Sequence, residues 1–86
     1  RIEKPRLVTD LSRLIKRYPA EARRKGWEGT VILDLRVAAD GTLAEAAIHQ
    51  TSGHRVLDQA ALRMIRDARF AGGPGRLLQP ISFTLR

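Results

Sequence analysis

Two alternating segments on either side of Asp40-Gly41 constrain the fold of this chain more than any other feature. Across residues 31–37, apolar side chains at every second position would share one face of a strand, and Ile32, Asp34 and Arg36 would share the other. Asp40-Gly41 predicts a two-residue type I′ hairpin turn, because glycine tolerates the positive φ that this turn requires. The segment therefore predicts an antiparallel hairpin.

The hairpin turn also predicts a register between the two strands. It pairs Ala39 with Thr42, Val37 with Ala44, Leu35 with Ala46, and Leu33 with Ile48. On the other face Arg36 comes opposite Glu45, a cross-strand pair of opposite charge, and His49 comes opposite Ile32. The inner face of the first strand thus meets small or apolar partners, as a buried face requires.

A helix and a third strand are predicted after the hairpin. Thr51-Ser52-Gly53 breaks the second strand and offers a side-chain cap, and an apolar stripe then predicts a helix of about four turns. The stripe comprises Val56, Leu57, Ala60, Ala61, Met64, Ile65 and Ala68. The segment Gly72–Gly75 predicts a loop. Alternation over Ile81–Arg86 predicts a strand, which Pro80 confines to a sheet edge because proline donates no ladder hydrogen bond.

The N-terminal quarter predicts two helices after an irregular start. Residues 1–8 show no periodicity and are interpreted as a linker end or extended arm, with the domain proper at 9–86. Asp10 is a suitable N-cap for a helix whose apolar face ends at Tyr18. Pro19 ends that helix and can begin another, which Gly26 ends after Lys25.

These elements predict an α+β fold. We expect a two-layer domain with a three-stranded antiparallel sheet in the order 2-1-3 and two to three helices on one face. This order places residues 31–37, the most apolar strand, in the centre, and leaves the proline-bearing strand at an edge.

The charge leaves more than one class of partner open. The 86 residues carry 16 Lys and Arg against 9 Asp and Glu, a net charge of +7, and there is no cysteine for a disulfide or a thiolate metal site. A cationic surface attracts nucleic acid, anionic membranes or acidic proteins, but a solvated helical face that keeps a small domain soluble is the favoured explanation of this charge. A small nucleic-acid-binding domain is the alternative interpretation. Against it, aromatic residues make up only 5% and no helix-turn-helix motif is present.

Neither catalysis nor a cofactor is predicted. Ser52, His54 and Asp58 lie close in sequence, but no nucleophile elbow accompanies them, and a loop entering a helix explains them better. His49 and His54 lack an evident third metal ligand. The Gly72–Gly75 loop precedes no helix whose dipole could support a phosphate. We therefore predict no enzyme, no metal site and no cofactor.

The order and spacing of several short motifs resemble the C-terminal domain of TonB-type energy transducers. The resemblance covers Tyr18 to Arg86. It rests on Tyr18-Pro19 followed by Ala20, Ala22 and Arg23, on Gly29 before Thr30–Val37, on Asp40-Gly41, on Thr51-Ser52-Gly53, on Leu57-Asp58 with Ala60-Ala61, and on Arg69-Phe70. The chain departs from the family at Ala68, where an aromatic is frequent, at Gly72, where proline is common, and at Pro80 in the approach to the last strand.

The resemblance implies a periplasmic binding module and no enzyme. In that family a single N-terminal helix, not in this chain, anchors the protein in the inner membrane, and a proline-rich spacer follows. The ExbB and ExbD motor, driven by the proton gradient, acts through that absent part. The module binds the TonB box and plug of outer-membrane receptors for siderophores, haem or cobalamin. No nucleic acid is implied, and monomer and strand-exchanged homodimer both remain compatible with exposed edges.

The resemblance also implies where the receptor would bind. The box peptide would add as a strand beside the last strand, here Leu78 to Leu85, and residues around the Tyr-Pro pair would contact the receptor. The implied partner-binding residues are Ile15, Lys16, Arg17, Tyr18, Pro19, Leu78, Ile81, Ser82, Phe83, Thr84 and Leu85.

Overall fold

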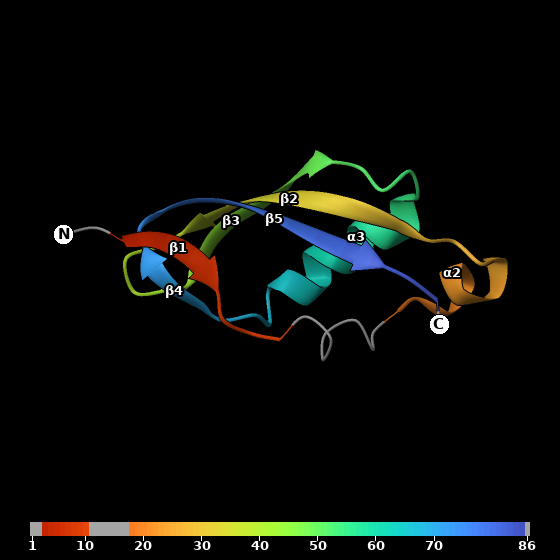
Figure 1. The fold of residues 1–86 in the computed structure, drawn as a ribbon, viewed down its shortest axis with the longest axis horizontal. Helices are drawn as coiled ribbons and strands as arrows, with labels where there is room; N and C mark the ends of the chain where they lie inside the picture. The colour runs from red at the N-terminus through yellow and green to blue at the C-terminus, as the bar shows by residue number, and fades with distance from the viewer. Residues whose placement is uncertain (1–2, 11–17, 86) are drawn as a thin grey trace.

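The computed structural model describes residues 3–10 and 18–85, which form two antiparallel sheets and two helices (Figure 1). The elements in chain order are β1 (Glu3–Leu7), α2 (Ala20–Lys25), β2 (Gly29–Val37), β3 (Leu43–Gln50), α3 (Arg55–Ile65), β4 (Phe70–Gly73) and β5 (Gly75–Phe83). One sheet has three strands in the order β3-β2-β5, and the other pairs β1 with β4. The helix predicted between Asp10 and Tyr18 falls largely on residues 11–17, which lie outside the described residues.

The α+β class and the predicted strand order are confirmed. The order 2-1-3 corresponds to β3-β2-β5, with β2 in the centre. Val31, Leu33 and Leu35 are fully buried on the face of β2 that α3 covers, while Arg36 on the other face is exposed. Burial of one face of the central strand against a helix is the arrangement that the alternation predicts.

The predicted hairpin register is confirmed in the middle and wrong at both ends. Leu33 pairs with Ile48, Leu35 with Ala46 and Arg36 with Glu45. Val37 pairs with Leu43 rather than Ala44, and Ile32 pairs with Gln50 rather than His49. Both differences follow from irregularities in the ladder, one on each side of residues 33–36, where the two strands advance by unequal numbers of residues.

The hairpin loop is longer than the predicted two-residue type I′ turn. It spans residues 38–42, and Gly41 adopts a φ of 86° while Asp40 keeps a negative φ. The Gly41 amide donates to the Ala38 carbonyl at 3.0 Å, and the Ala38 amide donates to the Thr42 carbonyl at 2.8 Å. A type I′ turn needs positive φ at both central residues, so a negative φ at Asp40 favours the longer loop with a left-handed glycine.

Helix α3 packs against β2 and β3 but is shorter than predicted. It ends at Ile65, and the amides of Asp67 and Ala68 then donate to the carbonyls of Met64 and Ile65, both at 3.1 Å. Ala68 therefore lies beyond the helix. The predicted apolar stripe is otherwise confirmed, because its buried members are Leu57, Ala60, Ala61, Met64 and Ile65.

Strands β1 and β4 form a second sheet that the sequence does not predict. β1 lies in the segment interpreted as a linker end or arm, and β4 includes two residues of the predicted Gly72–Gly75 loop. Gly72 and Gly73 have φ of 79° and 92°, a backbone that glycine adopts readily and that local sequence signals do not distinguish from a loop. Beyond the ladder, the Val8 amide donates to the Arg69 carbonyl at 2.8 Å. The division of the chain at residue 8 stays a prediction.

The buried carboxylate of Asp58 organises the turn from β3 into α3. It accepts hydrogen bonds from the Ser52 amide at 2.9 Å, from the Ser52 hydroxyl at 2.7 Å and from the Thr51 hydroxyl. The predicted cap is therefore wrong, because His54 is the N-cap and Thr51 and Ser52 bind Asp58 instead. Burial acts to raise the pKa of Asp58, but the hydrogen bonds from Thr51 and Ser52 outweigh it and lower that pKa.

The same turn packs closely on the first residue of β2. A β-carbon at Gly29 would lie 2.7 Å from the Ser52 carbonyl oxygen and 3.2 Å from Ser52 Cβ. The close approach of these two backbones therefore requires glycine at position 29.

We predict that Asp58→Asn lowers the free energy of unfolding by about 1.5–3 kcal/mol at pH 7, the range for hydrogen bonds to a charged group. Because the folded pKa is lowered, this stabilisation is present above the unfolded pKa of about 3.9 and is lost as the pH falls through the folded value. Urea unfolding of both proteins between pH 7 and pH 3 should show the difference shrinking with acidification. Glu45→Gln, which removes an exposed carboxylate, is the control. A pH-independent difference would contradict the assignment.

We predict that Gly29→Ala destabilises the domain by about 1–3 kcal/mol through overpacking against Ser52. Thermal unfolding of Gly29→Ala and Gly53→Ala provides the comparison. A β-carbon at Gly53 meets no atom within 4 Å, although its φ of 95° carries conformational strain. A smaller loss of stability for Gly29→Ala than for Gly53→Ala would show that the start of β2 can move away from the Ser52 turn without an energetic cost.

Candidate partner-binding edge

Strand β5 forms one outer edge of the three-stranded sheet. It pairs with β2 along its whole length, from Phe83 opposite Gly29 to Gly75 opposite Val37. On its other side it has no ladder partner among residues 3–10 and 18–85. β1 lies beside the start of β5, where a β-carbon at Gly75 would lie 3.0 Å from Pro5 Cδ. The open part of the edge is therefore its later part, from about Leu78 to Phe83.

The strand at this edge begins earlier and ends earlier than predicted. β5 starts at Gly75 and ends at Phe83, so Thr84 and Leu85 lie beyond it. The Leu85 amide donates to Glu28 Oε2 at 2.5 Å, a side-chain bond in place of a ladder bond. Leu77 and Ile81 point to the same face of the strand, so Leu77 could have indicated that β5 starts earlier. The polar Gln79 between them interrupts the apolar alternation.

Side chains along the open edge divide by parity. Ile81 and Phe83 are fully buried in the core, so they can offer a partner backbone groups but not their side chains. Leu78 and Ser82 lie on the face of the sheet opposite α3, where Leu78 is 43% exposed and the Ser82 hydroxyl lies 3.0 Å from that of Thr30. Among the predicted site residues of this strand, Leu78 and Ser82 can therefore contact a partner through their side chains.

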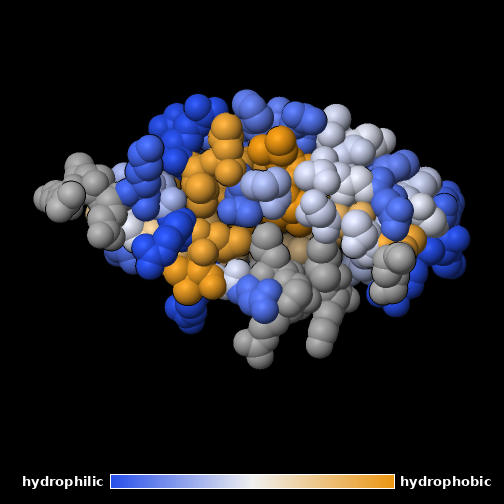
Figure 2. Space-filling model, viewed as in Figure 1, coloured by the Kyte–Doolittle hydropathy of each residue, from blue (hydrophilic) through white to orange (hydrophobic). Residues whose placement is uncertain are grey.

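Apolar surface gathers beside this edge. Figure 2 shows hydrophobic side chains over β5 and the adjoining end of β1, interleaved with hydrophilic ones. Val8, just after β1, is 58% exposed and is one of three large apolar side chains classed as exposed among the described residues, together with Leu78 and Ile48. Such a patch beside an open strand can receive apolar side chains of a docked segment.

An ion pair fixes β5 to the central strand. Arg76 donates two hydrogen bonds to the carboxylate of Asp34, each at 2.9 Å, in a bidentate arrangement. The hydrogen bond from Arg76 is the main cause that lowers the pKa of Asp34. The pair is not predicted from the sequence, because the predicted edge strand begins at Leu78 and so leaves out Arg76.

Tyr18 and Pro19 lie at the far end of the edge. The Tyr18 ring is buried and meets Phe83 edge-on, with ring centroids 5.4 Å apart, and its hydroxyl donates to the Trp27 carbonyl. Burial is the main cause that raises the pKa of Tyr18. Pro19 is the N-cap of α2 rather than its first residue. Ile15, Lys16 and Arg17 lie outside the described residues, so their role stays a prediction.

The aromatic residues leave little support for the nucleic-acid alternative. Tyr18, Phe70 and Phe83 are buried. Trp27 is half-buried between His54, stacked at 4.9 Å, and the Lys25 ammonium, 4.9 Å from its ring centroid. A single-strand binding surface needs aromatic faces open to bases, and each of these rings is engaged within the domain.

Ser52, His54 and Asp58 are brought together without forming a catalytic relay. The Ser52 hydroxyl lies against Asp58 and the His54 ring stacks on Trp27, so the histidine does not stand between the other two. In residues 3–10 and 18–85 no group of three His, Cys, Asp or Glu side chains could hold a metal ion. No helix in the described part of the chain has the length and apolar character needed to cross a membrane.

The chain is similar in sequence to proteins named TonB and tonB2. Residues 15–86 match the family described as Gram-negative bacterial TonB protein C-terminal. The chain is 41% identical over 76 residues to Protein TonB of Haemophilus influenzae, covering 83% of this chain and 28% of that protein. It is 47% identical over 49 residues to Protein tonB2 of Pseudomonas aeruginosa, covering 57% of this chain and 18% of that protein.

Solved structures show the same fold at low sequence identity. The solution structure of the Pseudomonas aeruginosa TonB CTD aligns with a TM-score of 0.65 at 18% identity, covering 99% of this chain and 82% of that one. The Helicobacter pylori TonB-CTD aligns with a TM-score of 0.65 at 22% identity, covering 88% and 78%. The family match extends over most of the chain and agrees with the fold. The chain therefore belongs to the Gram-negative bacterial TonB protein C-terminal family.

Proposed function

We propose that this domain binds an extended receptor peptide by β-strand addition at the open edge of β5. The observation that carries the proposal is the single ladder partner of β5 within the described residues. An edge strand offers unpaired N–H and C=O groups, which another extended chain can satisfy. Membership of the family and the exposed Leu78 beside the edge support the same choice.

The backbone of β5 limits what a peptide can bond. The N–H and C=O of one residue in an antiparallel strand point to the same side, and this side alternates along the strand. Proline is tolerated in a strand where its nitrogen faces away from the ladder, which assigns Pro80 to the open side. Leu78 and Ser82 have the same parity, so their amides and carbonyls would face the peptide together with the carbonyl of Pro80. That carbonyl accepts the Gln79 side-chain amide at 3.0 Å in the free domain, and the peptide would replace this bond. This gives about five hydrogen bonds.

Five such bonds are part of what a transient complex needs. Each contributes about 0.5–1.5 kcal/mol net, and the peptide loses conformational entropy when it becomes ordered. Apolar contact with the exposed Leu78 must add to these bonds, and together we expect a binding free energy of roughly −5 to −8 kcal/mol, which corresponds to micromolar or weaker affinity. Arg23, Arg24 and Lys25 are exposed at the end of α2, where they would attract acidic receptor segments over distance.

Family membership supports a wider role for the domain. The partner would be the box peptide and plug of an outer-membrane receptor for siderophores, haem or cobalamin. The domain would act in the periplasm as part of a longer inner-membrane protein that the ExbB and ExbD motor drives. It would bind rather than catalyse.

Titration of the isotopically labelled domain with a synthetic receptor box peptide tests the proposal. We predict that the amide NMR signals of Leu78, Ser82 and their neighbours shift with micromolar affinity. These residues would lose water and gain a backbone partner. Saturating peptide without shifts in β5 would disprove strand addition at this edge.

Two substitutions at one position separate backbone from side-chain recognition. Ser82→Pro removes an amide assigned to the open side, and we predict about a tenfold loss of peptide affinity with the fold retained. Ser82→Ala keeps that amide and removes only the hydroxyl beside Thr30, so its affinity should stay close to the original. Equal peptide affinities for the two variants, measured by titration calorimetry, would contradict the assignment of the Ser82 amide to the open side of β5. Amide spectra of both variants check the fold.

A further inference from the structure

The three-stranded sheet has a second open edge, formed by β3. This strand pairs with β2 on one side, and on the other it has no ladder partner within residues 3–10 and 18–85. Besides the larger Glu45, Ile48, His49 and Gln50, its exposed residues include the small Ala44 and Ala47. Strand side chains point to the two faces of a sheet, so the backbone groups at this edge are open to an additional strand.

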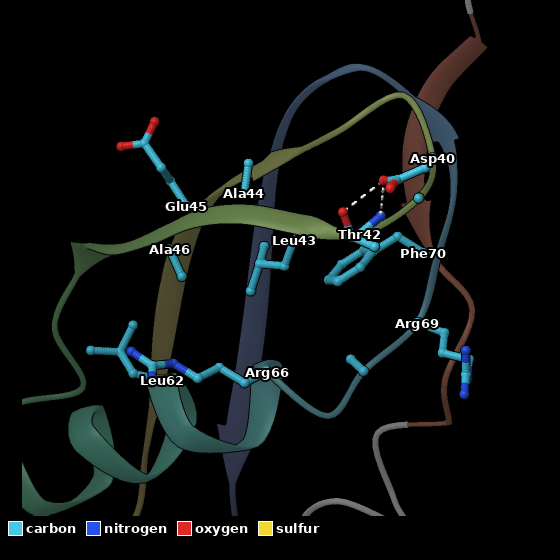
Figure 3. Close-up of a pocket in the computed structure, with 12 residues that line it drawn as sticks. Asp40, Thr42, Leu43, Ala44, Glu45, Ala46, Leu62, Arg66, Arg69 and Phe70 are labelled. Atoms are coloured by element: carbon cyan, nitrogen blue, oxygen red, sulfur yellow. Dashed lines mark hydrogen bonds between the residues drawn. The ribbon is translucent and has the colours of Figure 1, made fainter.

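A cavity lies beside the first half of this edge. It has a volume of about 640 Å³ and is lined by residues of the hairpin loop, of β3 and of the end of α3. Figure 3 shows Leu43 and Ala46 pointing from β3 toward the helix, with Leu62 and Arg66 on the opposite wall. The apolar walls of the cavity are formed by Leu43, Ala46, Leu62, Ala68 and Phe70.

The acidic side chains at this cavity are engaged or point away from it, whereas basic side chains are available to a partner. The carboxylate of Asp40 accepts the Thr42 amide at 3.0 Å and the Thr42 hydroxyl at 2.6 Å. Glu45 points away from the cavity and lies opposite Arg36 in the ladder. Arg66 and Arg69 line the cavity and are exposed, and neither guanidinium forms an ion pair within the described part of the chain. Figure 3 shows the Arg69 side chain pointing away from the cavity, so Arg66 is the cation on its wall. The cavity therefore presents apolar walls and available positive charge.

We propose that β3 and this cavity form a second peptide-binding site, for an acidic extended segment of a partner protein. The segment would add to the open edge of β3. One apolar side chain would enter the cavity, and a carboxylate two residues away would pair with Arg66. Residues two apart in a strand point to the same face, so one segment can supply both groups. β2 separates this site from β5, and the proposal does not depend on binding at β5.

Charge complementarity favours an acidic partner over a second copy of this domain. The whole chain carries a net charge of +7, so association of two copies would bring like charges together. An acidic segment would instead meet Arg66 at the cavity. Affinity for it should fall as salt screens the attraction.

A charge-matched peptide pair tests the site on the complete labelled chain. The probe is a blocked seven-residue peptide of alternating threonine and valine, with phenylalanine and aspartate placed two positions apart. We expect it to shift the amide signals of Leu43–Gln50 and Leu62–Arg66. The same peptide with lysine in place of aspartate should bind about fivefold more weakly. A version with every amide N-methylated should not bind, because it cannot add to a strand.

Two charge reversals at the C-terminal end of α3 complete the test. Arg66→Glu, at the C-cap, should weaken the aspartate peptide by about fivefold and strengthen the lysine peptide. Arg63→Glu is the matched control, because it is exposed in the last turn of α3, makes the same change of net charge and does not line the cavity. Thermal unfolding verifies that both variants fold. Equal effects of the two reversals would show that only net charge matters and would overturn the proposal.

Three further outcomes decide between the edges and a second copy. Shifts at β3 that persist in the Ser82→Pro variant support a separate site, whereas shifts confined to Leu78–Phe83 overturn it. No shift at saturating peptide overturns it as well. If the chain sediments as a dimer and the amide signals of β3 change on dilution, this edge serves self-association. That result would overturn the proposal of an acidic partner.

Discussion

The pairing of β2 on both sides is the constraint on which the rest of the structure depends. Its two ladders hold β3 and β5, and its buried face, with Val31, Leu33 and Leu35, gives α3 a surface to cover. A three-stranded open sheet built around one central strand must have two edges. Each edge of this domain differs in surroundings: β5 lies beside exposed apolar side chains, and β3 lies beside a cavity with an available arginine. Both proposals of strand addition therefore depend on the sheet being open on its two sides within the described residues.

The sequence predicted the central sheet well because its signals there are local and repeated. Alternation over residues 31–37 and the apolar stripe from Leu57 to Ile65 each specify an element and its buried face. Strand order followed from the position of Pro80 and from the apolar character of the centre. These signals do not require knowledge of distant contacts, which is why they were sufficient.

The errors arose where distant residues decide the backbone. Leu85 leaves the ladder through a bond to Glu28, and β1 becomes a strand only because β4 lies beside it. The Asp34–Arg76 pair joins positions 42 residues apart, and Arg76 lay between the predicted loop and the predicted strand. Asp58 was interpreted as part of a simple helix start, yet it binds Thr51 and Ser52. For the candidate site, the sequence predicted which strand forms the edge and which of its side chains are buried. It did not predict the residues at which that strand begins and ends.

The small sheet of β1 and β4 has a mechanical consequence. Figure 1 shows β1 at one end of the molecule, while β5 runs from there toward the end that carries α2. Tension on the chain before Glu3 would act along the axis of β1, so it would shear the ladder with β4 and load several hydrogen bonds simultaneously. Peeling a strand breaks such bonds one after another and requires less force. The two-stranded sheet would therefore act as a clamp that passes a pull into the domain before the central sheet deforms.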